Sequence, residues 1–340
     1  MSGYVLMLAV LPVAAGRMGD IFGRREVYLI GLLLFIGASA ACSLASSVYV
    51  LIAFRLVQGA GGAMMQPTTL SIVTNAFPAH ERGMAVGIWG GVSGLGLILG
   101  PILGGLLVHG DQWRLIFLVN IPVGALALLM AVRFVPSSRD DSAARMVDVP
   151  GVVLLSGGLF LIMLAVTRGN SAGWGSPQVL GCLIIGAACL PAFVMVERRA
   201  KAPLVDLSLF KSQTFVMACV ASFLFSASVF GSQPYTSLFM QNFWGFTPLQ
   251  GGLAFLPSTV LVALITPFSG IVSQRLGPRL RYLIMVASIS VALSFLYLLK
   301  LDVTDRYVTG FLPSFVLRGV GIGLFISATS LVVVSAVPLT

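Results

Sequence analysis

The stretch GRMGDIFGRR, residues 16–25, places four charged side chains and three glycines between two strongly apolar segments. Asp20 can accept charge-assisted hydrogen bonds from an arginine or from a helix N-terminus. The arginines beside it are Arg17, Arg24 and Arg25. The glycines allow a tight turn and a close approach of helices. The pattern predicts an ion-paired latch that closes one face of the protein in one state and breaks in another, although an ordinary charged turn has the same composition.

Two arginines lie inside apolar segments. Arg55 lies in IAFRLVQGAGGAMMQP, with Gln58 and Gly59 after it, and Arg318 lies in LRGVGIGLF. An arginine in a membrane costs at least about 2.5 kcal/mol, so it is expected to face a partner or a water-filled cavity. An interaction with an acidic group would suit proton coupling. A snorkelling arginine that reaches the membrane surface is the alternative.

The acidic residues all lie in loops or at the ends of apolar segments. They are Asp20, Glu26, Glu81, Asp111, Asp140, Asp141, Asp148, Glu197, Asp206, Asp302 and Asp305. His80 and His109 also lie near segment ends, so the sequence offers no titratable group at mid-membrane. The four cysteines lie within apolar runs without the close spacing of a metal site.

The composition predicts a membrane protein. Hydrophobic residues make up 58% of the chain, charged residues 9%, and the mean hydropathy is +1.02. A soluble domain carries about a quarter charged residues. The net charge of +9 does not indicate nucleic-acid binding, because the basic residues lie in short loops. No phosphate-binding Gly-Lys-Ser/Thr loop is present, so we expect neither an enzyme nor an ATP-driven pump, and no cofactor or metal.

Eleven apolar segments are long enough, or nearly so, to cross a bilayer as helices. They lie near 2–16, 27–46, 48–76, 84–108, 115–135, 149–167, 178–197, 214–240, 250–273, 281–299 and 308–338. The first is short, which suggests that the chain begins partway through a helix. The fold class expected is therefore an all-α membrane protein.

The distribution of basic residues predicts the orientation of these spans. With the 17–26 loop in the cytoplasm, fourteen of the twenty Lys and Arg residues lie in cytoplasmic loops and four in outer loops, with Arg55 and Arg318 inside spans. We therefore expect a multi-pass protein of the plasma (inner) membrane.

Two long polar stretches divide the chain into three parts. The expected parts are an N-terminal bundle at 1–135, a two-helix insert with its flanking cytoplasmic loops at 136–213, and a C-terminal bundle at 214–340. The two bundles resemble each other. GIVSQRLGPR, residues 270–279, corresponds to GRMGDIFGRR, and Arg318 with its glycines corresponds to Arg55. Such repeats place the substrate path of many transporters at the repeat interface.

The segment GIWGGVSGLGLILGPILGG, residues 87–105, carries the strongest motif. Its glycines at 96, 100 and 104 recur every four residues and form a stripe suited to close helix contact, and its proline weakens the helix. The motif positions are Gly87, Gly96, Gly100, Pro101, Gly104 and Gly105. A generic small-residue packing face is the alternative reading.

These motifs together resemble the major facilitator superfamily, and within it the fourteen-helix drug/proton antiporters. GRMGDIFGRR is similar to the family's loop signature, R-x-x-Q-G at 55–59 to its fourth span, 87–105 to its antiporter signature, and QWRLIFLVNIPVG at 112–124 to the start of its sixth span. The resemblance covers essentially the whole chain as spans two to twelve. It implies two six-helix bundles plus the insert, with the first span and the last two missing here.

The resemblance implies secondary active export of small amphipathic, drug-like compounds in exchange for protons, by alternating access. It gives Arg55, Gln58, Asp20, Arg24 and Arg25 roles in proton coupling or gating, and in the family the proton-carrying carboxylate lies in the first span. Aromatic side chains of a substrate cavity would be Phe225, Phe230, Tyr235 and Phe239, unless they are packing residues. Export of a native metabolite or antibiotic, and a non-functional truncated fragment, remain alternatives. The expected partners are the substrate, protons and the lipid bilayer.

Overall fold

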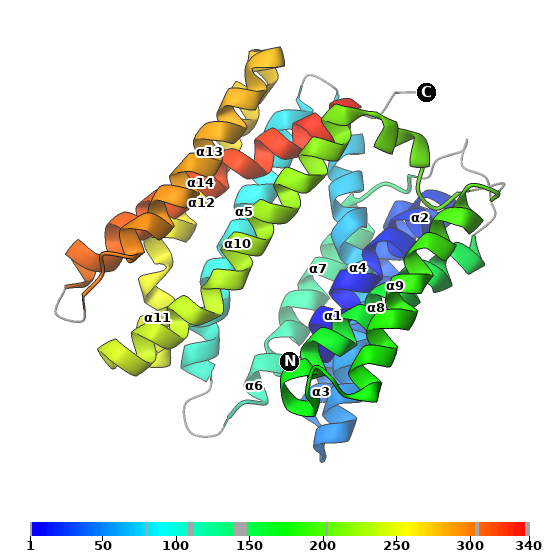
Figure 1. The fold of residues 1–340 in the computed structure, drawn as a ribbon, viewed down its shortest axis with the longest axis horizontal. Coiled ribbons are helices and arrows are strands. Elements are labelled where there is room, and N and C mark those ends of the chain that lie inside the picture. The colour runs from blue at the N-terminus through cyan, green and yellow to red at the C-terminus, as the bar shows by residue number, and fades with distance from the viewer. Residues whose placement is uncertain are drawn as a thin grey trace. The chain divides into compact units, whose positions relative to one another are not determined.

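The computed structural model of the chain describes residues 2–78, 81–107, 112–138, 148–200, 203–302 and 306–336. All regular secondary structure in these ranges is helical, as expected from the sequence. Contacts divide the chain into two compact units (Figure 1). Unit 1 comprises Met1–Ile72 and Trp113–Leu207, and unit 2 comprises Val73–Gln112 and Ser208–Thr340.

Unit 1 is built from the helices of the first third of the chain and from those around the insert. They are α1 (Ser2–Val10), α2 (Pro12–Phe22), α3 (Arg24–Ser43), most of α4 (Val48–Ala76), α6 (Leu115–Leu118), α7 (Asn120–Phe134), α8 (Val149–Ala172) and α9 (Pro177–Glu197).

Unit 2 contains the remaining helices. They are α5 (Arg82–Leu107), the 3-10 helix η2 (Leu207–Lys211), α10 (Gln213–Trp244), α11 (Pro248–Ala254), α12 (Leu256–Leu276), η3 (Gly277–Arg279), α13 (Leu280–Leu298) and α14 (Tyr307–Ala336). Its most buried apolar cluster joins α10, α11 and α14 through Met240, Ala254, Phe311 and Phe315.

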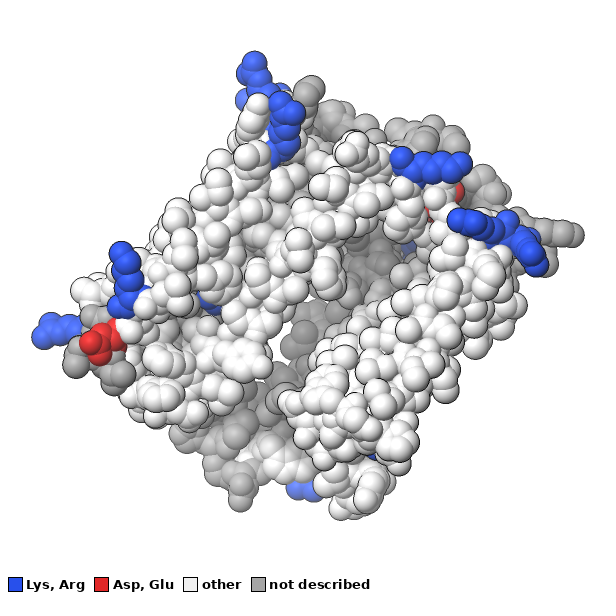
Figure 2. Space-filling view, viewed as in Figure 1, with Lys and Arg blue, Asp and Glu red and all other residues white. Residues whose placement is uncertain are grey.

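The helices have the length and apolarity that a membrane requires. Among the described residues, nine helical segments can cross a bilayer, and a tenth is the pair α1 and α2 if this bent pair counts as one span. α5 corresponds to the remaining expected span. On the face shown in Figure 2, most charged side chains gather near helix ends, and the surface between them is largely uncharged.

The predicted bounds of the first span, 2–16, and of the following loop, 17–26, are both wrong. The helix breaks at Leu11, where α1 and α2 meet at a bend of 54°, and α2 continues to Phe22. Proline at the first position of α2 suits a helix start. Gly23 alone interrupts the helices before α3, with φ 110° and ψ 133°. The charged motif is thus largely helical, because the helical hydrogen bonds of α2 continue through its charged residues and stop only at Gly23.

The contacts of α5 differ from the sequence-based grouping. This helix lies in unit 2 and packs along α12, where a Cβ on Gly87 would lie 2.8 Å from Pro267 Cα and one on Gly91 3.0 Å from Ala263 O. Close packing of this kind depends on glycine, because any side chain would meet the backbone of the neighbouring helix. The bundle boundaries expected at 135 and 213 remain predictions.

The insert helices α8 and α9 form a tightly packed pair (Figure 1). A Cβ on Gly186 would lie 2.9 Å from Gly158 O, so small residues set the close approach of the two helices. Asp148 caps α8 by accepting from Gly151 N at 3.0 Å, and Ser176 caps α9. Ser156 Oγ on α8 donates to Val10 O on α1 at 3.4 Å, which connects the insert to the rest of unit 1.

Candidate functional site

Asp20 and Arg24 form an ion pair across the glycine turn. Arg24 Nε and Nη2 donate to Asp20 Oδ1 at 3.2 and 2.9 Å. The predicted contact between Asp20 and an arginine is therefore present. A partly exposed pair of this kind contributes little stability by itself, about 0.2–1 kcal/mol. Its value lies in fixing the relative direction of α2 and α3 on either side of Gly23.

The same turn is bonded to the end of α7 and to the segment that follows it. Arg25 Nη2 donates to Val132 O at 2.7 Å, and Arg24 N donates to Ser138 O at 2.9 Å. Ser137 Oγ donates to Glu26 Oε1 at 2.6 Å. These bonds join residues more than a hundred positions apart within unit 1. Glu26 and Ser137 were not identified from the sequence, which holds no signal that links them.

The glycines of this motif lie against α4. A Cβ on Gly19 would lie 3.1 Å from Thr68 Cγ2, and one on Gly16 would lie 3.7 Å from Pro67 Cβ. The expectation that the glycines permit a close helix approach is met at Gly19, where the contact is tighter than ordinary van der Waals contact.

Arg55 lies in a polar and aromatic network inside unit 1. Its Nη1 donates to Gln58 Oε1 at 2.8 Å, and Gln58 Nε2 donates to Ser39 Oγ at 2.7 Å. Its guanidinium carbon lies 4.5 Å from the centre of the Tyr4 ring and 5.5 Å from that of Phe117. Cation–π contacts of this type contribute about 0.5–2 kcal/mol each.

The network explains how the membrane interior accommodates Arg55. Gln58 is 1% exposed and joins the charged group to α3 through Ser39. Asn120 Nδ2 also lies 3.5 Å from Ser39 Oγ, which connects α7 to the same polar cluster. Sequence reasoning identified Arg55 and Gln58 but missed Tyr4, Ser39 and Phe117, because these residues are brought together only by helix packing. The acidic partner expected for Arg55 is not among its contacts in the described residues.

Arg318 is the counterpart of Arg55 in unit 2, and its surroundings differ. It is 3% exposed, and its guanidinium carbon lies 4.8 Å from the ring centre of Phe295 and 5.8 Å from that of Phe315. Its Nε and Nη2 have no hydrogen-bond partner in the described residues. The position of Gln58 is taken by Gly321, where a Cβ would lie 2.7 Å from Ala287 O. The second repeat therefore has a close contact of α14 with α13 at this position, in place of the amide acceptor.

The glycine turns of the two related loop motifs, 16–25 and 270–279, occupy matching places in the two repeats. Gly23 lies between α2 and α3, and Gly277 lies between α12 and α13, with φ 110° and φ 50°. Both values fall where residues with a side chain are disfavoured. The two motifs therefore share a glycine with positive φ at this position, although ψ is 133° at Gly23 and −123° at Gly277.

The α5 motif makes its close contacts at one end of the expected stripe only. Gly87, Gly90 and Gly91 pack against α12, with 2.8–3.0 Å between their Cβ positions and the nearest atoms. At Gly96, Gly100 and Gly104 no atom of another helix lies within 4 Å of the Cβ position. The close helix contact expected at these three positions is thus not made within the described part of the chain. α5 also includes Pro101 and Gly105, whose surroundings lie outside that part.

The four aromatic residues expected around a substrate all lie on α10, and the cavity that they would line remains a prediction. Phe225 stacks on Phe325 with ring centres 3.7 Å apart, and Phe239 packs on Phe311 and Phe243. Phe230 and Tyr235 are exposed, at 59% and 75%. Phe225 and Phe239 thus pack within unit 2, whereas Phe230 and Tyr235 are open to the surroundings of α10.

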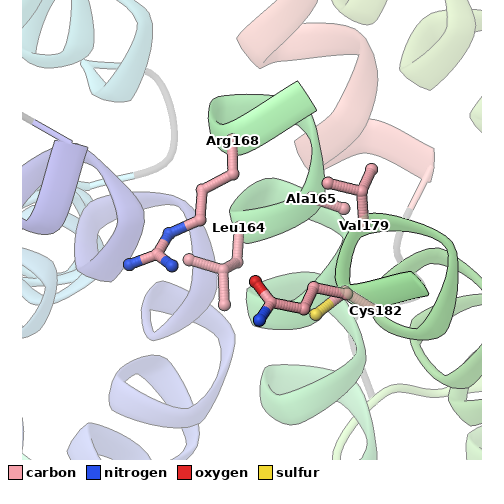
Figure 3. Close-up of a pocket in the computed structure, with 6 residues that line it drawn as sticks. Leu164, Ala165, Arg168, Val179 and Cys182 are labelled. Atoms are coloured by element: carbon pink, nitrogen blue, oxygen red, sulfur yellow. The ribbon is translucent and has the colours of Figure 1, made fainter. Parts of the chain in front are cut away.

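A cavity of about 340 Å³ opens between the insert helices (Figure 3). Leu164, Ala165 and Arg168 line it from α8, and Gln178, Val179 and Cys182 from α9. Its lining is mainly apolar, with the polar groups of Arg168 and Gln178 at the end where the two helices connect. This cavity could not be predicted from the sequence, because it depends on the register of the two helices.

Comparison with known proteins identifies the family. Residues 1–339 match the Major Facilitator Superfamily. The chain is 35% identical over 337 residues to the tetracenomycin C resistance and export protein of Streptomyces glaucescens, which covers 99% of this chain and 62% of that protein. It is 36% identical over 338 residues to the multidrug resistance protein Stp of Mycobacterium tuberculosis, with the same coverage of each chain.

A solved structure agrees on the fold. The human organic anion transporter MFSD10 aligns with a TM-score of 0.56 at 19% identity, over 98% of this chain and 75% of that one. At this identity the likeness concerns the fold alone. The present chain spans 62% of the length of the two bacterial relatives described above.

The apolar helices and the bacterial relatives make this a multi-pass protein of the plasma membrane, as the sequence predicted. The expected all-α membrane architecture and the family resemblance are confirmed. The chain belongs to the Major Facilitator Superfamily.

Proposed function

We propose that the protein is a secondary active exporter of small amphipathic, drug-like compounds, driven by the inward flow of protons. The observation that carries the proposal is the identity of 35% over 337 residues with a tetracenomycin C resistance and export protein. The multidrug resistance protein Stp and the multidrug transporter protein MdtP of Bacillus subtilis support the same reading. Alternating access between two repeats would carry the substrate across the membrane.

In this proposal Asp20, Arg24, Arg25 and Glu26, here called the Asp20 cluster, act as a latch on the cytoplasmic face. The ion pair with Arg24 and the bond from Arg25 to Val132 O hold α2 and α3 at a fixed angle to the end of α7. These bonds are partly exposed and individually weak, so a conformational change can exchange them for others at a small cost in free energy. Gly23 supplies the backbone freedom for that exchange.

Arg55 would act in proton coupling, by an interaction with a carboxylate that gains and loses a proton during transport. Its bond to Gln58 and its two aromatic contacts hold the guanidinium in one place. The remaining N–H donors of the fork-shaped group leave capacity for a carboxylate.

A native antibiotic or metabolite is a second candidate substrate. Tetracenomycin C and methylenomycin A appear in the names of relatives from Streptomyces, each 35% identical to this chain. Such substrates belong to the same exporter mechanism and differ only in what the cavity accepts.

Proton-coupled export can be tested in everted membrane vesicles that contain the chain. We expect ethidium uptake that requires a proton gradient, and release of that gradient when ethidium is added. Asp20→Asn keeps the side-chain shape but removes the charge, so it should slow uptake while leaving membrane insertion unchanged. Asp302→Asn makes the same charge change in the loop before α14 and is the matched control. Uptake that persists without a proton gradient would contradict proton coupling, and an Asp20→Asn rate equal to that of the control would contradict the latch.

A further inference from the structure

Two carboxyl groups meet at one end of the insert, outside both repeats. Asp148 precedes α8 as its N-cap, and Glu197 is the last residue of α9. Glu197 is 3% exposed. Asp148 Oδ2 and Glu197 Oε2 are both buried and have no hydrogen-bond partner in the described residues. A buried carboxylate oxygen without a donor is costly, so this arrangement calls for a positive charge or a proton.

The other oxygen of each carboxyl group is satisfied by the backbone. Asp148 Oδ1 accepts from Gly151 N at 3.0 Å, and Glu197 Oε1 accepts from Val205 N. These bonds fix both side chains and direct their remaining oxygens to the same place. Both remaining oxygens lie within 3.0 Å of the position that a Cβ would take on Gly151. The absence of a side chain at residue 151 allows the two carboxyl groups to meet.

Among the described residues, the charges around the pair do not neutralise it. Within the described chain, Asp148 is the charged group that acts on Glu197. Arg198 and Arg199 follow Glu197 and are exposed, and Asp206, beyond Val205, adds a further acid to the same segment. α1, which packs against α8, carries no charged side chain. Two ionised carboxylates held this close repel each other, and the usual result is that one keeps its proton.

We propose that Asp148 and Glu197 share one proton at neutral pH, and that the protonated carboxyl group donates to the unpartnered oxygen of the other. The shared proton joins the start of α8 to the end of α9, and through Val205 to the segment that leads into α10. The site is separate from Arg55 and the Asp20 cluster, so it does not depend on the proposed export activity. It makes the packing of the insert sensitive to the pH on its side of the membrane, which the distribution of basic residues assigns to the cytoplasm.

Infrared spectroscopy of the purified full chain in nanodiscs tests for the proton directly. The wild type should show the carbonyl stretching band of a buried protonated carboxyl group at about pH 7, above the unperturbed range of Asp and Glu. Glu197→Gln and Asp148→Asn should each lose this band, because the amide then supplies the hydrogen bond and the remaining carboxyl group is ionised. Asp302→Asn, which removes the same charge from unit 2, should keep it.

The pH dependence of stability gives an independent reading. The folded chain binds a proton that the unfolded chain does not, so the wild-type melting temperature should fall by several degrees as the pH rises from about 6 to about 9. Glu197→Gln should keep its melting temperature over the same range, because its amide donor does not titrate. A wild type without the band, or a band that persists in Glu197→Gln, would overturn the proposal. A chelator that lowers the melting temperature, with recovery on adding Mg²⁺ or Ca²⁺, would also overturn it by showing a metal ion in place of the proton.

Discussion

Gln58 is the residue on which the polar network of unit 1 depends most. It is 1% exposed and makes two hydrogen bonds, as acceptor from Arg55 Nη1 at 2.8 Å and as donor to Ser39 Oγ at 2.7 Å. Gln58→Leu replaces the amide by an apolar group of similar size. The change leaves the volume filled, so its effect on stability reports on the two hydrogen bonds.

The expected loss follows from the kinds of bond removed. A hydrogen bond to a charged group contributes about 1.5–3 kcal/mol, and a neutral one about 0.5–1.5 kcal/mol. Ser39 keeps its own bond to Phe35 O at 2.7 Å, and the contacts of Arg55 with Tyr4 and Phe117 also remain. The bond to Ser39 joins two helices, and such bonds in membrane proteins average nearer 0.6 kcal/mol. With the lower value for the bond to Arg55, we expect a total loss of about 2 kcal/mol in the free energy of unfolding.

The assay is reversible unfolding of the purified chain in mixed detergent micelles, followed by helical circular dichroism. Gln66→Leu is the matched control, because it makes the same substitution on an exposed side of the same helix. It should change stability by no more than about 0.5 kcal/mol. If Gln58→Leu and Gln66→Leu unfold alike, the network does not stabilise Arg55 and the reasoning is wrong.

Three further predictions follow from the packing and the topology. Gly87→Ala should lower the free energy of unfolding in detergent by about 1–3 kcal/mol, because its Cβ would lie 2.8 Å from Pro267 Cα. Gly96→Ala, which has open space at its Cβ position, should be neutral or stabilising. Equal stabilities of the two variants would argue against the α5–α12 contact. Arg318→Met should raise the free energy of unfolding by about 1 kcal/mol or more, since it removes a buried charge with two unpartnered nitrogens, whereas Arg55→Met should lower it by leaving the Gln58 acceptor unpaired. Single cysteines at Asp140 and Asn170 in a cysteine-free background should label from outside intact cells only at 170, and labelling at 140 alone would reverse the predicted orientation.

Composition and motif spacing were sufficient to predict the class of protein. A charged content of 9% and long continuous apolar segments predict a protein that is embedded in a lipid bilayer. The family resemblance depended on short patterns with defined spacing, such as R-x-x-Q-G at 55–59, and such patterns can be read directly from the chain. A contact of Asp20 with an arginine could also be predicted, because opposite charges lie close together in the 16–25 motif, but the choice of Arg24 depends on the turn at Gly23.

Local signals failed wherever a helix boundary depended on one residue. The charged residues Arg17 and Asp20 suggested a loop, yet they continue α2, which stays helical up to Gly23 with its positive φ. The break between α1 and α2 at Leu11 lay inside what read as a single apolar run.

Contacts between distant segments were decided by the tertiary structure alone. Nothing in the sequence pairs Ser39 with Gln58, Glu26 with Ser137, or Asp148 with Glu197, because each pair depends on the register between helices. The glycines of α5 show the same limit. The sequence marks positions where a close approach is allowed, and the structure uses Gly87 and Gly91 against α12 but not Gly96 or Gly100. Small residues permit contact, whereas the neighbouring helix determines where the contact is made.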